Sequence, residues 1–285
     1  MLSRLTLTIL TNNRVQKRDL LAEDGLSFHI DCDAGQFLFD TGLSDVFLKN
    51  AEKLNIDMAA VQKIIFSHGH RDHTGGLVHY LKAFGKGEVI CHYNIFNRKY
   101  RVFEHGRMEV GMPQEKSDLV RMGGDFILKT HYYKVAGDVY LSGEIPRVNT
   151  FDLPAEFHQE QALESYITDP LKDDMALILN TTKGLVVLLG DTHSGLINTL
   201  THVVDKTGKN QFFAIVGGLN LRQSPDDKVE KIAYELQQFQ FDYLIPIHST
   251  GQRAFGIFER HFPGRVTHLC VGDQLVLDAV PEAKA

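Results

Sequence analysis

The chain has 285 residues, 43% of them hydrophobic and 23% charged, so it can bury a sizeable core and is neither disordered nor fibrous. Its formal net charge of −6 at pH 7 argues against nucleic-acid binding, which usually needs a basic surplus. Its 3 cysteines are widely spaced and form no CxxC pair, which excludes a disulfide framework and a cysteine zinc knuckle.

Targeting and membrane signals are not expected. The N-terminal run 1–10 is apolar but interrupted by Arg4 and hydroxyl residues, so it reads as an alternating strand rather than a signal peptide. The longest apolar run, 185–189, is far too short to span a bilayer. We therefore expect a cytoplasmic protein that contacts no membrane.

The first part of the chain is rich in predicted strands. Short apolar or alternating runs bounded by turn residues predict strands over 5–10, 27–30, 37–39 and 61–66. A helix is predicted over 45–53, with Asp45 near its start and lysines in its last turns.

The middle of the chain, about 94–161, is less regular. It carries the Gly123-Gly124 pair, a turn-like segment at 143–146 and weak strand signals over 126–129 and 138–141. We interpret it as an insertion or lid within a single domain that spans 1–285.

Regular alternation of strands and helices returns in the last part. A hairpin is predicted from strands 175–180 and 185–189. The predicted elements that follow are helix 196–204, strand 212–216, helix 228–239, strand 243–247, helix 254–261 and a closing strand pair, 266–269 with 274–277. Helices outside packed mixed sheets would suit this order.

The densest cluster of candidate ligands directly follows the predicted strand 61–66. In His68-Gly69-His70-Arg71-Asp72-His73, four potential metal ligands lie within six residues. His68 and His70 can converge on one cation while Asp72 and His73 turn towards a second, and small Gly69 permits the tight backbone. The alternative is a polar loop whose histidines face solvent.

This loop resembles the ligand loop of the metallo-β-lactamase superfamily, and further segments extend the resemblance. Phe39-Asp40-Thr41-Gly42 is similar to the superfamily's first motif, which implies that Asp40 orients a metal-bound histidine. The strand that ends at Asp191 is similar to the one carrying a metal-bridging carboxylate, and the strand before His248 to the one carrying the last ligand. The resemblance implies an α/β fold, the αββα sandwich: two mixed β-sheets packed face to face with helices on both outer faces.

The sequence does not decide which histidine is the third ligand of the first ion. The superfamily generally supplies a histidine between the ligand loop and the bridging carboxylate. The histidines in that interval are His79, His92, His105, His131 and His158. His193, two residues after Asp191, would point to the same side of an extended strand end. We favour His193, with His158 as the alternative.

Within the superfamily, the chain is similar to a branch of dihydropterin ribofuranosyl-aminobenzene phosphate synthase-like proteins. The matching segments are 22–27, 37–42, 67–76, 143–147, 173–177 and 246–251. Two positions depart from the branch: Asp191 replaces a cysteine and Asn220 replaces a histidine. A carboxylate favours a site of oxygen and nitrogen ligands, and an amide cannot exchange a proton as an imidazole can.

Together these features predict a metal-dependent hydrolase that uses a hydroxide activated by a dinuclear site. The expected ligands are His68, His70 and His193 for one ion, Asp72, His73 and His248 for the other, and Asp191 bridging both. Asp72 and Asp191 are the expected catalytic residues, with Asp72 orienting the hydroxide. The expected cofactors are two divalent metal ions, zinc ahead of iron, manganese or nickel.

The expected substrate is a small anionic molecule, a phosphoester or related ester. Arg147 and Arg222 are candidates for holding its negative charge, and Asn220 for contacting it. One alternative is a condensing transferase, in which the metals grip a pyrophosphate leaving group while an aromatic amine attacks. Another is a non-catalytic protein that binds metal or a ligand.

Overall fold

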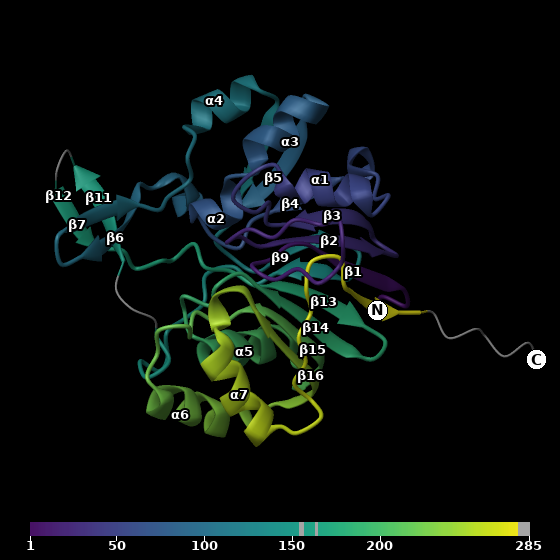
Figure 1. Cartoon of the computed structure of the whole chain (residues 1–285), viewed down its shortest axis with the longest axis vertical. Coiled ribbons are helices and arrows are strands. Elements are labelled where there is room, and N and C mark those ends of the chain that lie inside the picture. Colours follow the sequence, from purple (N-terminus) through teal and green to yellow (C-terminus); the bar gives the residue numbers. More distant parts are fainter. Residues whose placement is uncertain (154–156, 163–164, 279–285) are drawn as a thin grey trace, which may run out of the picture.

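The computed structural model describes residues 1–153, 157–162 and 165–278. Two mixed β-sheets pack face to face, as Figure 1 shows. The first sheet has seven strands in the order β17 (Gln274–Leu277), β1 (Leu5–Thr11), β2 (Ser27–Cys32), β3 (Gly35–Phe39), β4 (Lys63–Ile65), β5 (Gly87–Cys91) and β8 (Gly124–Leu128). The second has six in the order β16 (Gln240–Ile247), β15 (Gln211–Gly218), β14 (Gly184–Leu189), β13 (Leu177–Thr181), β10 (Val139–Leu141) and β9 (Tyr133–Ala136).

Helices cover the outer face of each sheet (Figure 1). Those beside the first sheet are α1 (Val46–Lys53), α2 (Arg71–Thr74), α3 (Leu77–Phe84) and α4 (Lys116–Arg121). Those beside the second are α5 (Leu196–Thr207), α6 (Asp226–Leu236) and α7 (Gln252–His261). Short 3-10 turns lie at Met58–Ala60, Tyr93–Phe96 and His248–Thr250. This arrangement confirms the predicted αββα sandwich.

A third, smaller sheet projects from one side of the sandwich (Figure 1). Its strand order is β12 (Ser165–Thr168), β11 (His158–Ala162), β6 (Lys99–Phe103) and β7 (Gly106–Glu109). The middle segment 94–161 is thus divided, since it supplies strands to this small sheet and also β8, β9 and β10 to the two large ones.

The alternation of apolar side chains explains why β14 is buried on both faces. Val186 and Leu188 pack between the two sheets, whereas Leu185, Val187 and Leu189 pack against the outer helices. Because successive side chains of a strand point to opposite faces, a continuous apolar run is what such a central strand needs. No helix among the described residues is long and apolar enough to cross a membrane.

One predicted strand is wrong. Residues 266–269 form no strand, and only an isolated bridge joins Val266 to Leu244. The last strand, β17, pairs with β1 instead, because Leu277 completes the apolar core between the two sheets. No pattern in the sequence indicated α3 or β5.

The topology brings distant parts of the chain to one edge of the sandwich. Strands β3, β4 and β5 are parallel to one another, and so are β14, β15 and β16. Because the carboxyl ends of parallel strands lie at the same edge of a sheet, the residues that follow these strands gather there. These residues are Asp40, His68, Asp191, Asn220 and His248.

Candidate metal centre

Three imidazole nitrogens face one another in a first cluster. His68 Nε2 lies 3.0 Å from His70 Nδ1, and His193 Nε2 lies 3.2 Å from the former and 3.1 Å from the latter. Zinc–nitrogen bonds of about 2.0–2.1 Å in a tetrahedron put ligand nitrogens about 3.3 Å apart. The three rings therefore stand at the separation that a tetrahedral cation requires.

A second cluster combines two imidazoles and two carboxylates. His73 Nε2 lies 3.8 Å from Asp72 Oδ2, and His248 Nε2 lies 3.4 Å from the same oxygen. Both ring nitrogens are buried and have no hydrogen-bond partner. A buried polar atom without a partner costs about 1–3 kcal/mol, and a cation between these four groups would remove that cost. The donor set thus fits a divalent ion.

Asp191 belongs to both clusters. Its Oδ2 lies 3.6 Å from His193 Nε2 and 3.7 Å from His73 Nε2, while its Oδ1 lies 3.5 Å from His248 Nε2. The Ser249 hydroxyl donates to the same Oδ1. One carboxylate shared between two groups of ligands is the arrangement of a dinuclear site.

Close backbone packing fixes the position of Asp191. A Cβ atom on Gly218 would lie 2.2 Å from the Gly190 carbonyl oxygen and 2.7 Å from Asp191 Oδ1. Thr192, which follows, has a left-handed φ of 47°, and this conformation costs a β-branched residue of the order of 1–3 kcal/mol. The surrounding structure therefore imposes this turn.

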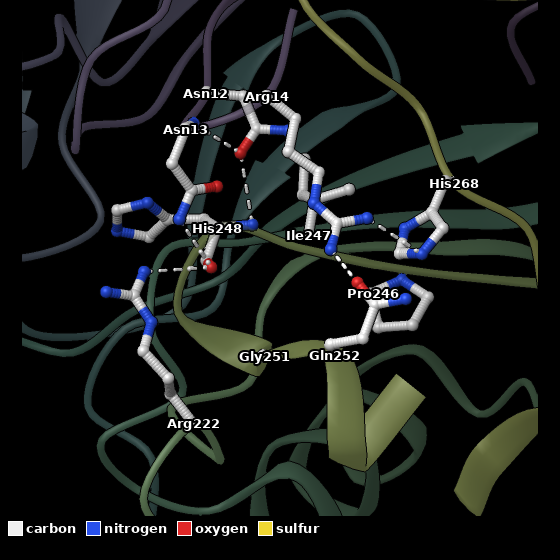
Figure 2. Close-up of a pocket in the computed structure, with 10 residues that line it drawn as sticks. All are labelled: Asn12, Asn13, Arg14, Arg222, Pro246, Ile247, His248, Gly251, Gln252 and His268. Carbon is white, nitrogen blue, oxygen red and sulfur yellow. Dashed lines mark hydrogen bonds between the residues drawn. The ribbon is translucent and has the colours of Figure 1, made fainter. Parts of the chain in front are cut away.

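Hydrogen bonds to its main chain hold His248. Its amide donates to Asn12 Oδ1 at 3.2 Å, and its carbonyl accepts from Asn13 Nδ2 at 3.1 Å and Arg222 Nη2 at 3.3 Å. Figure 2 shows these residues around a cavity of about 230 Å³. The backbone bonds support the left-handed φ of 52° that points the ring towards Asp191.

Burial and neighbouring charges set the protonation of the ligands. Burial, followed by the charge of His193, lowers the pKa of His70 to about 3, so the ring stays neutral and keeps a lone pair for a cation. Burial opposes ionisation of Asp72, but the charges of His73 and His248 outweigh it and lower the pKa of Asp72 to about 2. Both groups are thus in the form that binds metal at neutral pH.

Comparison with known proteins agrees with this geometry. The sequence profile of the Metallo-beta-lactamase superfamily matches residues 25–209. The chain belongs to the metallo-β-lactamase superfamily. The two clusters at the sheet edge are consistent with a dinuclear metal site.

Three relatives of the chain illustrate the range of the superfamily. The chain is similar to 7,8-dihydropterin-6-methyl-4-(beta-D-ribofuranosyl)-aminobenzene-5'-phosphate synthase of Methanocaldococcus jannaschii, with 27% identity over 85% of each chain. It is also similar to the uncharacterized protein MJ0448 of the same organism, with 28% identity over 86% of this chain and 91% of that one. The solved structure of Tm1679, a metal-dependent hydrolase of the β-lactamase superfamily, has a TM-score of 0.82 and 29% identity, covering 95% of this chain and 98% of the other.

The structure brings all seven expected ligands of this superfamily member together. Of the two candidates for the remaining ligand of the first ion, His193 lies in the first cluster with His68 and His70. His158 lies on β11 and is not part of that cluster. Asp40 accepts hydrogen bonds from Ser67 and lies 2.7 Å from His73 Nδ1, as the superfamily's first motif implied.

The expected substrate contacts make bonds within the protein. Arg147 donates to the Leu171 carbonyl at 3.1 Å, and Arg222 pairs with Asp24 at 3.2 Å besides its bond to His248. The Asn220 side-chain amide lies 3.1 Å from His193 Nδ1. Three further residues near the site, Lys99, Asp173 and Asp174, are buried, and the sequence patterns gave them no role. The one signal that could have indicated them is the pair of adjacent acids, Asp173 and Asp174, just before a buried strand.

Proposed function

We propose that this chain is a metal-dependent hydrolase acting on a small anionic phosphoester or related ester. The observation that carries the proposal is the carboxylate of Asp191 shared by two ligand clusters. When bound, two divalent ions at such a site supply a nucleophile at neutral pH and polarise the electrophile. We further propose zinc as the native metal, because histidine and carboxylate ligands at tetrahedral spacing suit Zn²⁺. Iron, manganese and nickel are the alternatives that the same donors accept.

Asp72 is the ligand best placed to meet a substrate. Its side chain is 29% exposed, whereas the other six ligands are buried. An ionised carboxylate at the open side of the site can accept a proton from an attacking water and fix its direction. Phe157 supports this assignment of the open side, because its ring covers His70 and His193 at centroid distances of 4.7 and 5.2 Å.

Arg222 favours an anionic substrate. Its side chain is 47% exposed and lies beside the second cluster, where its guanidinium already donates to the His248 carbonyl. Guanidinium suits phosphate and carboxylate groups because of its planar set of donors. We therefore assign Arg222, rather than Arg147, to the negative charge of the substrate.

A second candidate function is a condensing transferase, favoured by the 27% identity to the aminobenzene phosphate synthase. Asn220 argues against it. In the branch that this chain resembles, a histidine stands at that position, and an amide cannot donate or accept a proton as the histidine could. A hydrolysis driven by the metals needs no acid or base at Asn220.

An activity panel on metal-reconstituted protein distinguishes the two functions. We expect turnover of phosphodiesters, phosphomonoesters or lactones, and no condensation of a pterin pyrophosphate with an aromatic amine. The His70→Ala variant is the control, because it should abolish metal-dependent turnover. Condensation that is faster than hydrolysis would show that the transferase function is the correct one.

A further inference from the structure

We infer that Asp173 and Asp174 are positioning residues that set the distance between the two loops of the first cluster. One loop carries His68 and His70, and the other carries His193. Two adjacent carboxylates, one bonded to each loop, would hold the three imidazoles at the separation that a cation needs. The inference depends on metal binding at this cluster and not on the reaction that the protein catalyses.

Asp173 holds the first loop through its main chain. Its Oδ2 accepts a hydrogen bond of 2.8 Å from the amide of Gly69, the residue between His68 and His70. The backbone of the loop is closely packed at this point, since a Cβ atom on Gly69 would lie 2.5 Å from the Ile95 carbonyl oxygen. Losing the bond to Asp173 would therefore shift both neighbouring imidazoles together.

Asp174 holds the second loop in the same way. Its Oδ2 accepts a hydrogen bond of 2.6 Å from the amide of Ser194, the residue that follows His193. The Asp174 residue is 2% exposed, so this bond is not weakened by competing water. The two loops are thus tied to consecutive residues, although Gly69 and Ser194 are far apart in the sequence.

The segment that carries the two acids is itself anchored. The Met175 amide donates to the Ser67 carbonyl at 2.9 Å, immediately before the first loop. Arg147 donates to the Leu171 carbonyl at 3.1 Å, which supports the left-handed φ of 45° at that leucine. The acids therefore form a rigid reference from which both loops are placed.

The charge arrangement indicates a role other than stability. Lys99 Nζ lies 2.9 Å from Asp173 Oδ1 and 2.9 Å from Asp169 Oδ2, and none of the three side chains is more than 2% exposed. Burying ions costs several kcal/mol each, and apolar replacements of similar volume are often equally or more stable. A fixed acceptor for the Gly69 amide is something that an apolar side chain could not provide.

The test measures metal affinity in purified variants. Asp173→Ala and Asp174→Ala should weaken binding of one of the two ions by about 10- to 100-fold, the usual effect of losing a group that orients metal ligands. The conservative Asp174→Asn variant keeps an amide oxygen for the Ser194 N–H, so it should restore most of the affinity. Asp173→Asn should not, because an amide that accepts from Gly69 would turn its NH₂ group towards the Lys99 ammonium. Asp169→Asn is the matched control, because it removes the other carboxylate partner of Lys99, keeps an amide oxygen for the Leu171 N–H and contacts neither loop.

Cobalt absorption spectra identify which ion is affected. Spectra of His193→Ala and His248→Ala serve as references for loss of the first and the second ion. Asp173→Ala and Asp174→Ala should match the His193→Ala reference. The inference is overturned if Asp169→Asn weakens metal binding as much as Asp173→Ala and Asp174→Ala do, or if the folded alanine variants bind both ions like the wild type. Should Asp173→Ala fail to fold, Asp174→Ala decides the matter alone, because it leaves the partners of Lys99 intact.

Discussion

Asp40 Oδ2 lies 2.7 Å from His73 Nδ1, and neither side chain has any exposed surface. The same carboxylate accepts hydrogen bonds from the amide and the hydroxyl of Ser67, at 2.8 and 2.7 Å. With Nδ1–H donated to Asp40, Nε2 of His73 faces the second cluster, where it binds a cation in exchange for its proton. The carboxylate after β3 thus orients a ligand delivered after β4.

Replacing Asp40 by asparagine should weaken the binding of the second ion, the one that His73 ligates. An amide oriented to accept from Ser67 turns its NH₂ group towards His73 Nδ1, which is also a donor, so the ring loses its orienting partner. We expect metal affinity to fall about 10- to 100-fold in a competition titration. Asp45→Asn, on the surface at the start of α1, is the control. Unchanged affinity in Asp40→Asn would contradict the orienting role.

The Gly218→Ala variant should lose metal because its Cβ atom would collide with the Gly190 carbonyl and with Asp191. We expect the metal content to fall for both ions together with a lower melting temperature. Gly256→Ala in α7 is the matched control, since its Cβ atom would meet nothing within 4 Å. That control should be stabilised by roughly 0.5–1 kcal/mol, as expected for alanine in a helix interior. Full metal content in Gly218→Ala would show that Asp191 can move without loss of bound metal, and would contradict this prediction.

The metal-free protein should lose stability as the pH falls below about 6.5. Burial and the charge of His193 lower the pKa of His70 to about 3 in the folded chain, so only the unfolded chain is protonated between these values. His68 shifts in the same direction. Burial would lower the pKa of His73 too, but the charges of Asp40 and Asp72 raise it well above the usual value, so its contribution is lost as the pH rises.

Urea unfolding of chelator-treated protein between about pH 5 and pH 7 measures this dependence. For each proton taken up on unfolding, the free energy of unfolding changes by at most about 1.4 kcal/mol per pH unit. His70→Asn should therefore have a shallower slope on the acid side than the wild type. An identical slope in the variant would mean that His70 is protonated in the folded chain.

The fold and the ligand loop could be predicted because their signals are local. The ligand loop is a short motif after a buried strand, and the apolar runs of β14 and β16 mark central strands whatever their partners are. The end of the chain could not be predicted in this way: 266–269 has strand-like composition, yet β1 pairs with Gln274–Leu277. Strand pairing depends on which apolar side chains complete the core, and periodicity does not contain that information.

The supporting residues were beyond prediction for a related reason. Asp173 bonds to an amide 104 residues away and to a lysine 74 residues away, and no spacing pattern indicates such pairs. The choice between His193 and His158 was open because the direction of a side chain after a strand depends on the backbone turn. Here the left-handed φ of Thr192 decides it.

Anomalous diffraction from metal-loaded crystals tests the dinuclear site most directly. We predict two peaks about 3.5–4 Å apart, each bonded to a different oxygen of Asp191. One should lie about 2.0–2.2 Å from His68, His70 and His193, and the other at that distance from Asp72, His73 and His248. A single peak with the Asp191 carboxylate turned away from it would contradict the account.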